Sequence, residues 1–304
     1  MKELYQKLEN EQIGKIRLNE PLSKHTTMKI GGPADIFVEP NSIENLEKTV
    51  RFAREADVPF RVIGRGSNLL VDDEGIRGVV IKLGKGINHL EIENDVLRVG
   101  AGYPMVPLAT IMSKKGFSGF EFAGGIPGSV GGAVYMNAGA HGSDISEIII
   151  EARVLYPDGT LKWVSKEDLN YSYRTSALQF DGGICVEAKF KLTKGDPEKI
   201  YNDMKSFKDY RHRTQPYDMP CAGSIFRNPL PQHSGRLIEE AGLKGYKIGG
   251  AQISELHANF IVNTGDATAE NVRDLISFIK KTINDNSGID LHTEIEIILS
   301  QESN

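Results

Sequence analysis

The sequence of 304 residues is poor in cysteine, and this scarcity excludes two classes of protein. Its two cysteines, Cys185 and Cys221, cannot form the disulfide framework of a small secreted domain. Neither lies in a CxxC or His/Cys pattern with the spacing of metal ligands, so we expect no metal site. Such a chain suits a reducing compartment.

Long apolar runs are also missing. Residues 1–15 are charged throughout and contain no apolar segment of the kind found in signal peptides. No later stretch approaches the roughly 20 apolar residues that a membrane-spanning helix needs. We therefore expect a cytoplasmic protein that has no membrane partner.

Positive charge is not in excess, since the formal net charge is -5. Nucleic-acid recognition requires a concentrated cationic surface, and the sequence shows none, so we expect no nucleic-acid partner. Any anionic ligand must be bound by a few local side chains or by backbone groups.

Glycine, by contrast, is abundant, with 32 residues against a usual share of about 7%. Much of the excess lies in two loops, within residues 62–71 and 124–142. Each loop can aim backbone N–H groups at one point, which is how an uncharged loop binds a pyrophosphate. Neither matches a Rossmann or Walker A motif. Taken singly, either loop is equally well explained as a series of tight turns.

The apolar pattern predicts an α+β protein in which the first glycine loop directly follows a strand. Strands are expected at 60–63, 79–83, 96–101, 184–192 and 295–299, with a hairpin of 148–156 and 161–164. Helices are expected after the caps Asn41 and Ser42, between Pro104 and Gly116, from about Glu198, and along the stripe Val272, Leu275, Ile276, Ile279 and Ile283. Residues 193–197 are the expected linker.

Seven motifs give the chain its resemblance to a known family. They are the two glycine loops and residues 25–35, 171–176 (YSYRTS), 222–229 (AGSIFRNP) and a C-terminal pair, 237–245 and 257–263. In these the chain resembles the UDP-N-acetylenolpyruvoylglucosamine reductases, also called UDP-N-acetylmuramate dehydrogenases, over almost its whole length. The short spacing from Arg174 to Ser224 is similar to that of the type II subgroup.

The resemblance implies a fold, a cofactor and a reaction. The fold would be an FAD-binding region of the vanillyl-alcohol-oxidase type at residues 1–195, made of two α/β subdomains divided near residue 80. An α+β substrate-binding domain would follow at 196–304. NADPH would give a hydride to FAD, and the reduced flavin would pass it to UDP-N-acetylglucosamine enolpyruvate. This would be a cytoplasmic step of peptidoglycan synthesis, and so of cell-wall biogenesis, cell shape and division, and the enzyme would be a monomer or weak oligomer.

The resemblance also implies the residues that contact FAD. In the first loop these are Gly64, Arg65, Gly66, Ser67, Asn68 and Leu69. In and after the second loop they are Gly125, Ile126, Pro127, Gly128, Ser129, Gly131, Gly132, Ala133, Asn137 and Gly139, and Tyr173 would lie beside both flavin and substrate.

Three positions match the catalytic residues of the family. Arg174 would bind the carboxylate whose charge grows in the transition state. Ser224 would protonate the carbon next to the one that receives the hydride, aided by a helix start after Ala222-Gly223. The alternative for Ser224 is a helix cap or turn serine. Glu294 would orient the enol oxygen or share a proton with it, although its alternation with Ile295 and Ile297 is also typical of any half-buried strand.

The remaining assignments concern the nucleotide part of the substrate. The resemblance implies that Arg211, Arg213 and Asn228 hold the diphosphate and uracil, but the two arginines equally suit a cationic helix C-terminus. Many relatives carry a basic residue where this chain has Glu296, which alters the local charge. Two other functions stay open: another flavin oxidoreductase or oxidase on the same FAD scaffold, or a non-catalytic nucleotide-sugar binding protein.

Overall fold

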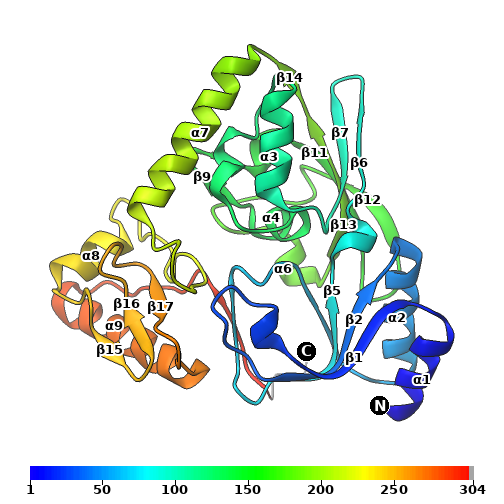
Figure 1. The fold of residues 1–304 in the computed structure, drawn as a ribbon, viewed down its shortest axis with the longest axis horizontal. Helices are drawn as coiled ribbons and strands as arrows, with labels where there is room; N and C mark the ends of the chain where they lie inside the picture. Colours follow the sequence, from blue (N-terminus) through cyan, green and yellow to red (C-terminus); the bar gives the residue numbers. More distant parts are fainter. Residues whose placement is uncertain (301–304) are drawn as a thin grey trace. The chain divides into compact units, whose positions relative to one another are not determined.

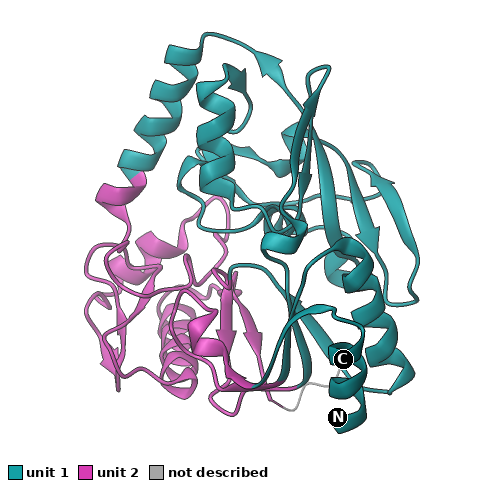
Figure 2. Ribbon diagram, turned by 45° about the vertical axis from the view of Figure 1, so that its right-hand side comes forward, with its two compact units in different colours: residues 1–18, 36–65, 78–210 teal, residues 19–35, 66–77, 211–304 magenta. Residues whose placement is uncertain are grey.

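The computed structural model describes residues 1–300 and divides the chain into two compact units. Unit 1 contains residues 1–18, 36–65 and 78–210, and unit 2 contains 19–35, 66–77 and 211–304 (Figure 2). This division differs from the single boundary expected after residue 195, because two N-terminal stretches join the C-terminal part. Each unit has a hydrophobic core of its own.

The N-terminal part of unit 1 is built on a four-stranded sheet in the order β1-β2-β5-β3. Its strands are β1 (Gly14–Pro21), β2 (Pro33–Pro40), β3 (Phe60–Ile63) and β5 (Ile76–Lys82). Helices α1 (Lys2–Asn10) and α2 (Ile43–Glu55) share a hydrophobic core with this sheet. The Ser42 hydroxyl accepts a hydrogen bond from Asn45 N at 3.1 Å, so the cap expected from the sequence starts α2. Strand β3 pairs in parallel with β5 and ends where the first glycine loop begins.

A second sheet in unit 1 is antiparallel, in the order β12-β11-β13-β7-β6. Its strands are β6 (Leu90–Glu93), β7 (Val96–Gly100), β11 (Ile149–Leu155), β12 (Leu161–Ser165) and β13 (Ile184–Lys191). Helices α3 (Met105–Lys114) and α4 (Val130–Met136) lie beside it (Figure 1). The expected hairpin of residues 148–164 is therefore confirmed as β11 and β12. Shorter elements are η2 (Lys85–Ile87), β8 (Phe117–Ser118), η3 (Glu121–Gly125), β9 (Gly139–Ala140), β10 (Ser143–Asp144), α5 (Ile145–Ile148), α6 (Leu178–Asp181) and β14 (Thr193–Lys194).

Unit 2 combines a strand from the N-terminal part of the chain with strands from the C-terminal part. Strand β4 (Leu69–Val71) pairs in parallel with β18 (Glu296–Ile298), and β15 (Lys247–Ile248), β16 (Ala251–Ile253) and β17 (Ile261–Asn263) form an antiparallel sheet. The apolar stripe beginning at Val272 is buried on α9 (Ala269–Ser287), as the sequence predicts. The other helices are η1 (Leu22–Lys24) and α8 (Ser234–Glu240), while α7 (Pro197–Thr214) belongs to unit 1 up to Tyr210.

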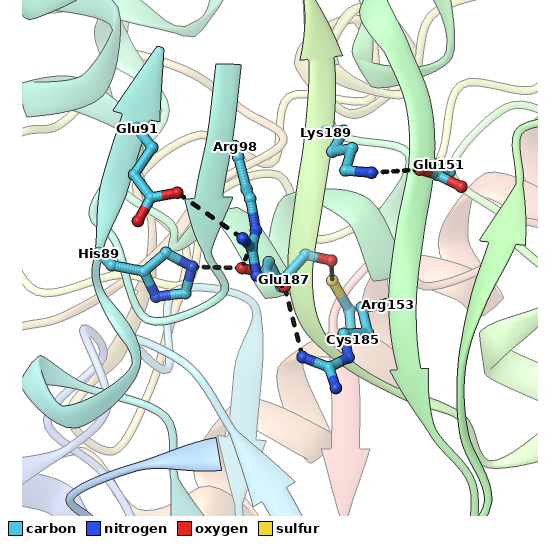
Figure 3. A network of polar contacts seen from close by, with 8 residues as sticks. All are labelled: His89, Glu91, Arg98, Glu151, Arg153, Cys185, Glu187 and Lys189. Carbon is cyan, nitrogen blue, oxygen red and sulfur yellow. Dashed lines mark hydrogen bonds and ion pairs between the residues drawn. The ribbon is translucent and has the colours of Figure 1, made fainter. Parts of the chain in front are cut away.

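A buried carboxylate on the five-stranded sheet of unit 1 is held by cationic side chains (Figure 3). Glu187 in β13 accepts hydrogen bonds from Arg98 Nε at 2.6 Å and Arg98 Nη2 at 3.1 Å, and it also pairs with His89. Arg153 Nη1 lies 3.8 Å from its second oxygen. Burial alone would raise the pKa of Glu187, but the bonds from Arg98 and His89 outweigh it and hold that pKa below the usual 4.5.

We expect Glu187→Gln to lower the free energy of unfolding by about 1–3 kcal/mol near pH 7, because it leaves cationic partners without a counter-charge. A lowered pKa contributes stability that is present above pH 4.5, the unfolded value, and is lost as pH falls through the folded value. Urea unfolding from pH 7 to pH 3 should therefore show the difference between the two proteins narrowing below about pH 4.5. A constant difference would contradict the lowered pKa.

Candidate active site

The start of the first glycine loop meets the second glycine loop within unit 1. Arg65, which follows the end of β3, donates from Nε to the Pro127 carbonyl oxygen at 3.2 Å. A Cβ atom on Gly64 would overlap the Ser129 hydroxyl. Residues 64–65 and 127–129 therefore lie in contact, and any side chain at Gly64 would separate them.

Glycine occupies positions 131 and 132 of the second loop for two different structural reasons. A Cβ on Gly131 would lie 2.9 Å from the Ala101 Cβ, so Gly131 is needed for the packing of α4 against the residue that follows β7. Gly132 is exposed, and a Cβ there would meet only the Ser129 hydroxyl, at 3.6 Å, among the described atoms. Glycine inside a helix costs about 1 kcal/mol relative to alanine, and packing against a close protein atom does not require it at position 132. The open space in front of Gly132 is what a closely approaching ligand requires.

This arrangement fits a dinucleotide diphosphate, because bare backbone faces open space beside the first turn of α4. Fewer backbone N–H groups can bind the diphosphate than the sequence suggests. Val130 N donates to Tyr103 O at 2.9 Å and Gly131 N donates to Ala101 O at 2.8 Å, so both N–H groups are already used within the protein. Other amides of the loop must bind the phosphates.

The second half of the first loop belongs to unit 2. A Cβ on Gly66, which has φ +65°, would overlap the His25 carbonyl oxygen, so glycine is required there by the fold. The Asn68 side chain donates to Glu294 O at 3.0 Å, and Glu296 N donates to Asn68 O at 2.9 Å. Asn68, expected at the cofactor, thus joins the loop to the segment of Glu294.

Arg174 is held in unit 1 by the hairpin of β9 and β10. Its Nη2 donates to Gly139 O at 2.7 Å, and its backbone has φ +57°, which is uncommon for arginine. The buried Asn137 side chain donates to Ser172 O at 3.0 Å and to Asp144 Oδ2 at 3.3 Å, and so ties down the segment that carries Arg174. The guanidinium lies 5.0 Å from the ring of Tyr173, which is 43% exposed.

The segment that follows Ser224 and the segment that carries Glu294 are joined in unit 2 through their backbones. Glu294 N donates to Ile225 O at 2.8 Å, and Phe226 forms an isolated bridge with Thr293. Ser224 lies half-buried in an irregular segment, and the next helix, α8, starts only at Ser234. The expectation of a helix start at Ser224, whether as cap or as dipole, is therefore wrong. Arg174 belongs to unit 1, whereas Ser224 and Glu294 belong to unit 2.

The expected nucleotide-binding residues have structural contacts of their own. Arg211 and Arg213 lie in the last turn of α7, where Arg211 Nε donates to Gln215 Oε1 at 3.1 Å. The Asn228 side chain accepts from Ser234 N at 3.1 Å at the start of α8. Asn259, for which the sequence predicts no role, contacts the segment after Ser224 through its buried side chain. An asparagine inside the apolar run 258–262 was the available signal.

Over residues 1–300, the structure contains no group of three or more His, Cys, Asp or Glu side chains arranged to hold a metal ion. Within the same residues, none of the helices combines the length and the apolar character that crossing a bilayer demands.

Comparison with known proteins decides the family. A family model described as UDP-N-acetylenolpyruvoylglucosamine reductase, C-terminal domain, matches residues 215–298, and one described as FAD binding domain matches 34–165. The UDP-N-acetylenolpyruvoylglucosamine reductase of Bacillus subtilis (strain 168) is 60% identical over 299 residues, covering 98% of this chain and 99% of the relative. The chain belongs to the UDP-N-acetylenolpyruvoylglucosamine reductase family.

Other members of this reductase family agree in sequence and in structure. The enzyme of Bacillus velezensis is 59% identical with the same coverage. The crystal structure of the UDP-N-acetylenolpyruvylglucosamine reductase from Thermus caldophilus is 36% identical, with a TM-score of 0.81 over 93% of this chain and 100% of that one. This family member is therefore an oxidoreductase, and FAD is its cofactor.

The fold class expected from the sequence is confirmed as well. The reductase has the FAD-binding region and the C-terminal α+β domain of its family. Alkyldihydroxyacetonephosphate synthase shares the fold at 18% identity, with a TM-score of 0.50 over 64% of this chain and 40% of that one.

Proposed function

We propose that this chain reduces UDP-N-acetylglucosamine enolpyruvate to UDP-N-acetylmuramate, with NADPH as the hydride donor. The observation that carries the proposal is the hydrogen bond of 2.8 Å from Glu294 N to Ile225 O, which holds a carboxylate-bearing residue beside the segment of the half-buried Ser224. Net addition of a hydride and a proton across the enolpyruvyl double bond needs a proton donor and a partner for the growing negative charge.

The side chains of this chain divide that work. Arg174 binds the substrate carboxylate, since a guanidinium fork matches its geometry and remains charged at every relevant pH. Ser224 donates its proton to the carbon next to the site of hydride addition. Glu294 orients the enol oxygen. When bound, FAD supplies the hydride from its reduced ring, because no side chain can carry one.

The cradle for the diphosphate of FAD consists of Gly64, Arg65 and residues 127–132. The Arg65 side chain closes it by its bond to Pro127 O at 3.2 Å. We assign residues 1–195 to cofactor binding and 196–304 to the substrate, whose diphosphate is met by the cationic end of α7. Arg211 and Arg213 supply that charge.

We place the reaction in the cytoplasm, as a step in the synthesis of peptidoglycan precursors. A free nucleotide sugar and a reduced nicotinamide are both substrates of that compartment, and two unpaired cysteines suit it.

The test is NADPH oxidation by the purified yellow protein, measured with and without oxygen and, in each case, with and without the enolpyruvyl nucleotide. We expect rapid oxidation only when the nucleotide is present, with UDP-N-acetylmuramate as the product. Rapid NADPH consumption driven by oxygen alone would instead identify a flavin oxidase. Binding of UDP-sugars without any turnover would identify a non-catalytic binding protein.

A further inference from the structure

The buried side chain of Asn259 acts as a strand partner for the residues that follow Ser224. Its Oδ1 accepts from Phe226 N at 3.0 Å, and its Nδ2 donates to Phe226 O at 2.8 Å. The backbone carbonyl of Asn259 accepts from Ile225 N at 2.8 Å. One residue that is only 4% exposed thus makes three hydrogen bonds to the two positions after Ser224.

Asn259 is itself fixed by a tight turn. Its N–H donates to His257 Nδ1 at 3.2 Å, and Phe260 N donates to His257 O at 3.0 Å. The neighbouring Ala258 is buried in the core of unit 2. The Asn259 side-chain amide is therefore held in place and cannot follow a movement of the Phe226 backbone. Its two hydrogen bonds restrain the segment that follows Ser224.

Glu294, the residue proposed to work with Ser224, binds the same segment from its other side. Ile225 donates its N–H to Asn259 O and accepts from Glu294 N, so both of its backbone groups are taken. Ser224 is the last residue before this doubly bound stretch. The direction of its hydroxyl therefore depends on a backbone that Asn259 holds in register with Glu294.

We infer that Asn259 is a positioning residue, which fixes the hydroxyl of Ser224 for proton transfer without touching substrate. This inference rests on the proposed role of Ser224. A misplacement of about 1 Å can cost on the order of 100-fold in rate, so loss of the asparagine has a kinetic consequence beyond lower stability.

The experiment compares Asn259→Ala with the matched variant Asn263→Ala. Asn263 is also buried, and its side chain also binds backbone, namely Met28 O at 3.0 Å, Gly265 N and Ala267 N, but not the Ser224 segment. In stopped-flow measurements of the holoenzyme, we expect Asn259→Ala to slow flavin reoxidation by the enolpyruvyl nucleotide by about 10- to 100-fold. Flavin reduction by NADPH should stay within about twofold, and Asn263→Ala should preserve both steps.

Two further measurements separate positioning from mere destabilisation. If Asn259 acts through Ser224, the double variant Ser224→Ala/Asn259→Ala should reoxidise no more slowly than Ser224→Ala alone. Hydrogen exchange of the peptide covering 221–229 should quicken in Asn259→Ala and not in Asn263→Ala. The inference would be overturned if the two substitutions slowed reoxidation independently, so that their effects multiplied in the double variant. It would also be overturned if Asn259→Ala slowed both half-reactions equally. If Ser224→Ala itself leaves reoxidation unchanged, the proposed function fails first.

Discussion

Ser224→Ala is expected to leave flavin reduction by NADPH nearly intact and to slow flavin reoxidation by the enolpyruvyl nucleotide by about 10²- to 10⁴-fold. The hydroxyl is needed only when the carbon beside the site of hydride addition takes up its proton, so the first half-reaction does not involve it. Serine is a weak acid, and it donates only to a strongly basic carbon. Because Ser224 caps no helix, the substitution removes a proton donor without removing a structural cap.

The control is Ser234→Ala. The Ser234 hydroxyl donates to Arg227 O at 2.6 Å and is fully buried, so its loss should reduce stability and leave reoxidation within about twofold. Stopped-flow spectra of the two half-reactions, recorded separately, make the comparison. Equal slowing of both half-reactions in Ser224→Ala would remove the serine from the proton-transfer step.

Gly132→Leu is expected to abolish FAD binding while leaving the cofactor-free protein folded. Leucine is a good helix former, and a Cβ at this exposed position would meet only the Ser129 hydroxyl, at 3.6 Å, among the described atoms, so the apoprotein should gain up to about 1 kcal/mol. The same side chain would fill the space in front of α4 that we assign to the diphosphate. The measurements are flavin content by visible absorbance and thermal unfolding of the deflavinated protein.

Gly131→Ala should give the opposite result. Its Cβ would lie 2.9 Å from the Ala101 Cβ and 3.3 Å from two carbonyl oxygens, so this variant should lose stability even without FAD. If Gly132→Leu instead retains stoichiometric flavin, the diphosphate lies elsewhere and the assigned cradle is wrong.

Local features of the fold could be predicted from the sequence because they depend on neighbouring residues. The stripe from Val272 to Ile283 repeats with helical spacing, and the whole stripe is buried on α9. Strand β3 has the expected bounds of 60–63, and α3 lies between Pro104 and Gly116 as expected. The strand expected at 295–299 is β18, which begins at Glu296 rather than Ile295, because residue 294 pairs with Ile225 instead.

The interleaving of the two units could not be predicted. Within residues 66–77, strand β4 (Leu69–Val71) pairs with β18, and no local pattern encodes which distant partner a short strand will take. The structural roles of three asparagines could not be predicted from the sequence for a related reason. Asn68, Asn137 and Asn228 each suit a ligand by residue type, yet the structure shows their side chains bound to backbone, a use that depends on the tertiary fold.

The parallel pairing of β4 with β18 also sets an order of events during synthesis. Asn68 and Glu294, which this pairing brings together, stand 226 positions apart. At about 5–20 residues per second, the ribosome takes roughly 10–45 s to make the intervening chain. During that interval Leu70 and Val71, which are about 1% exposed in the folded protein, lack their partner strand, so the nascent chain must shield a short apolar edge until β18 emerges.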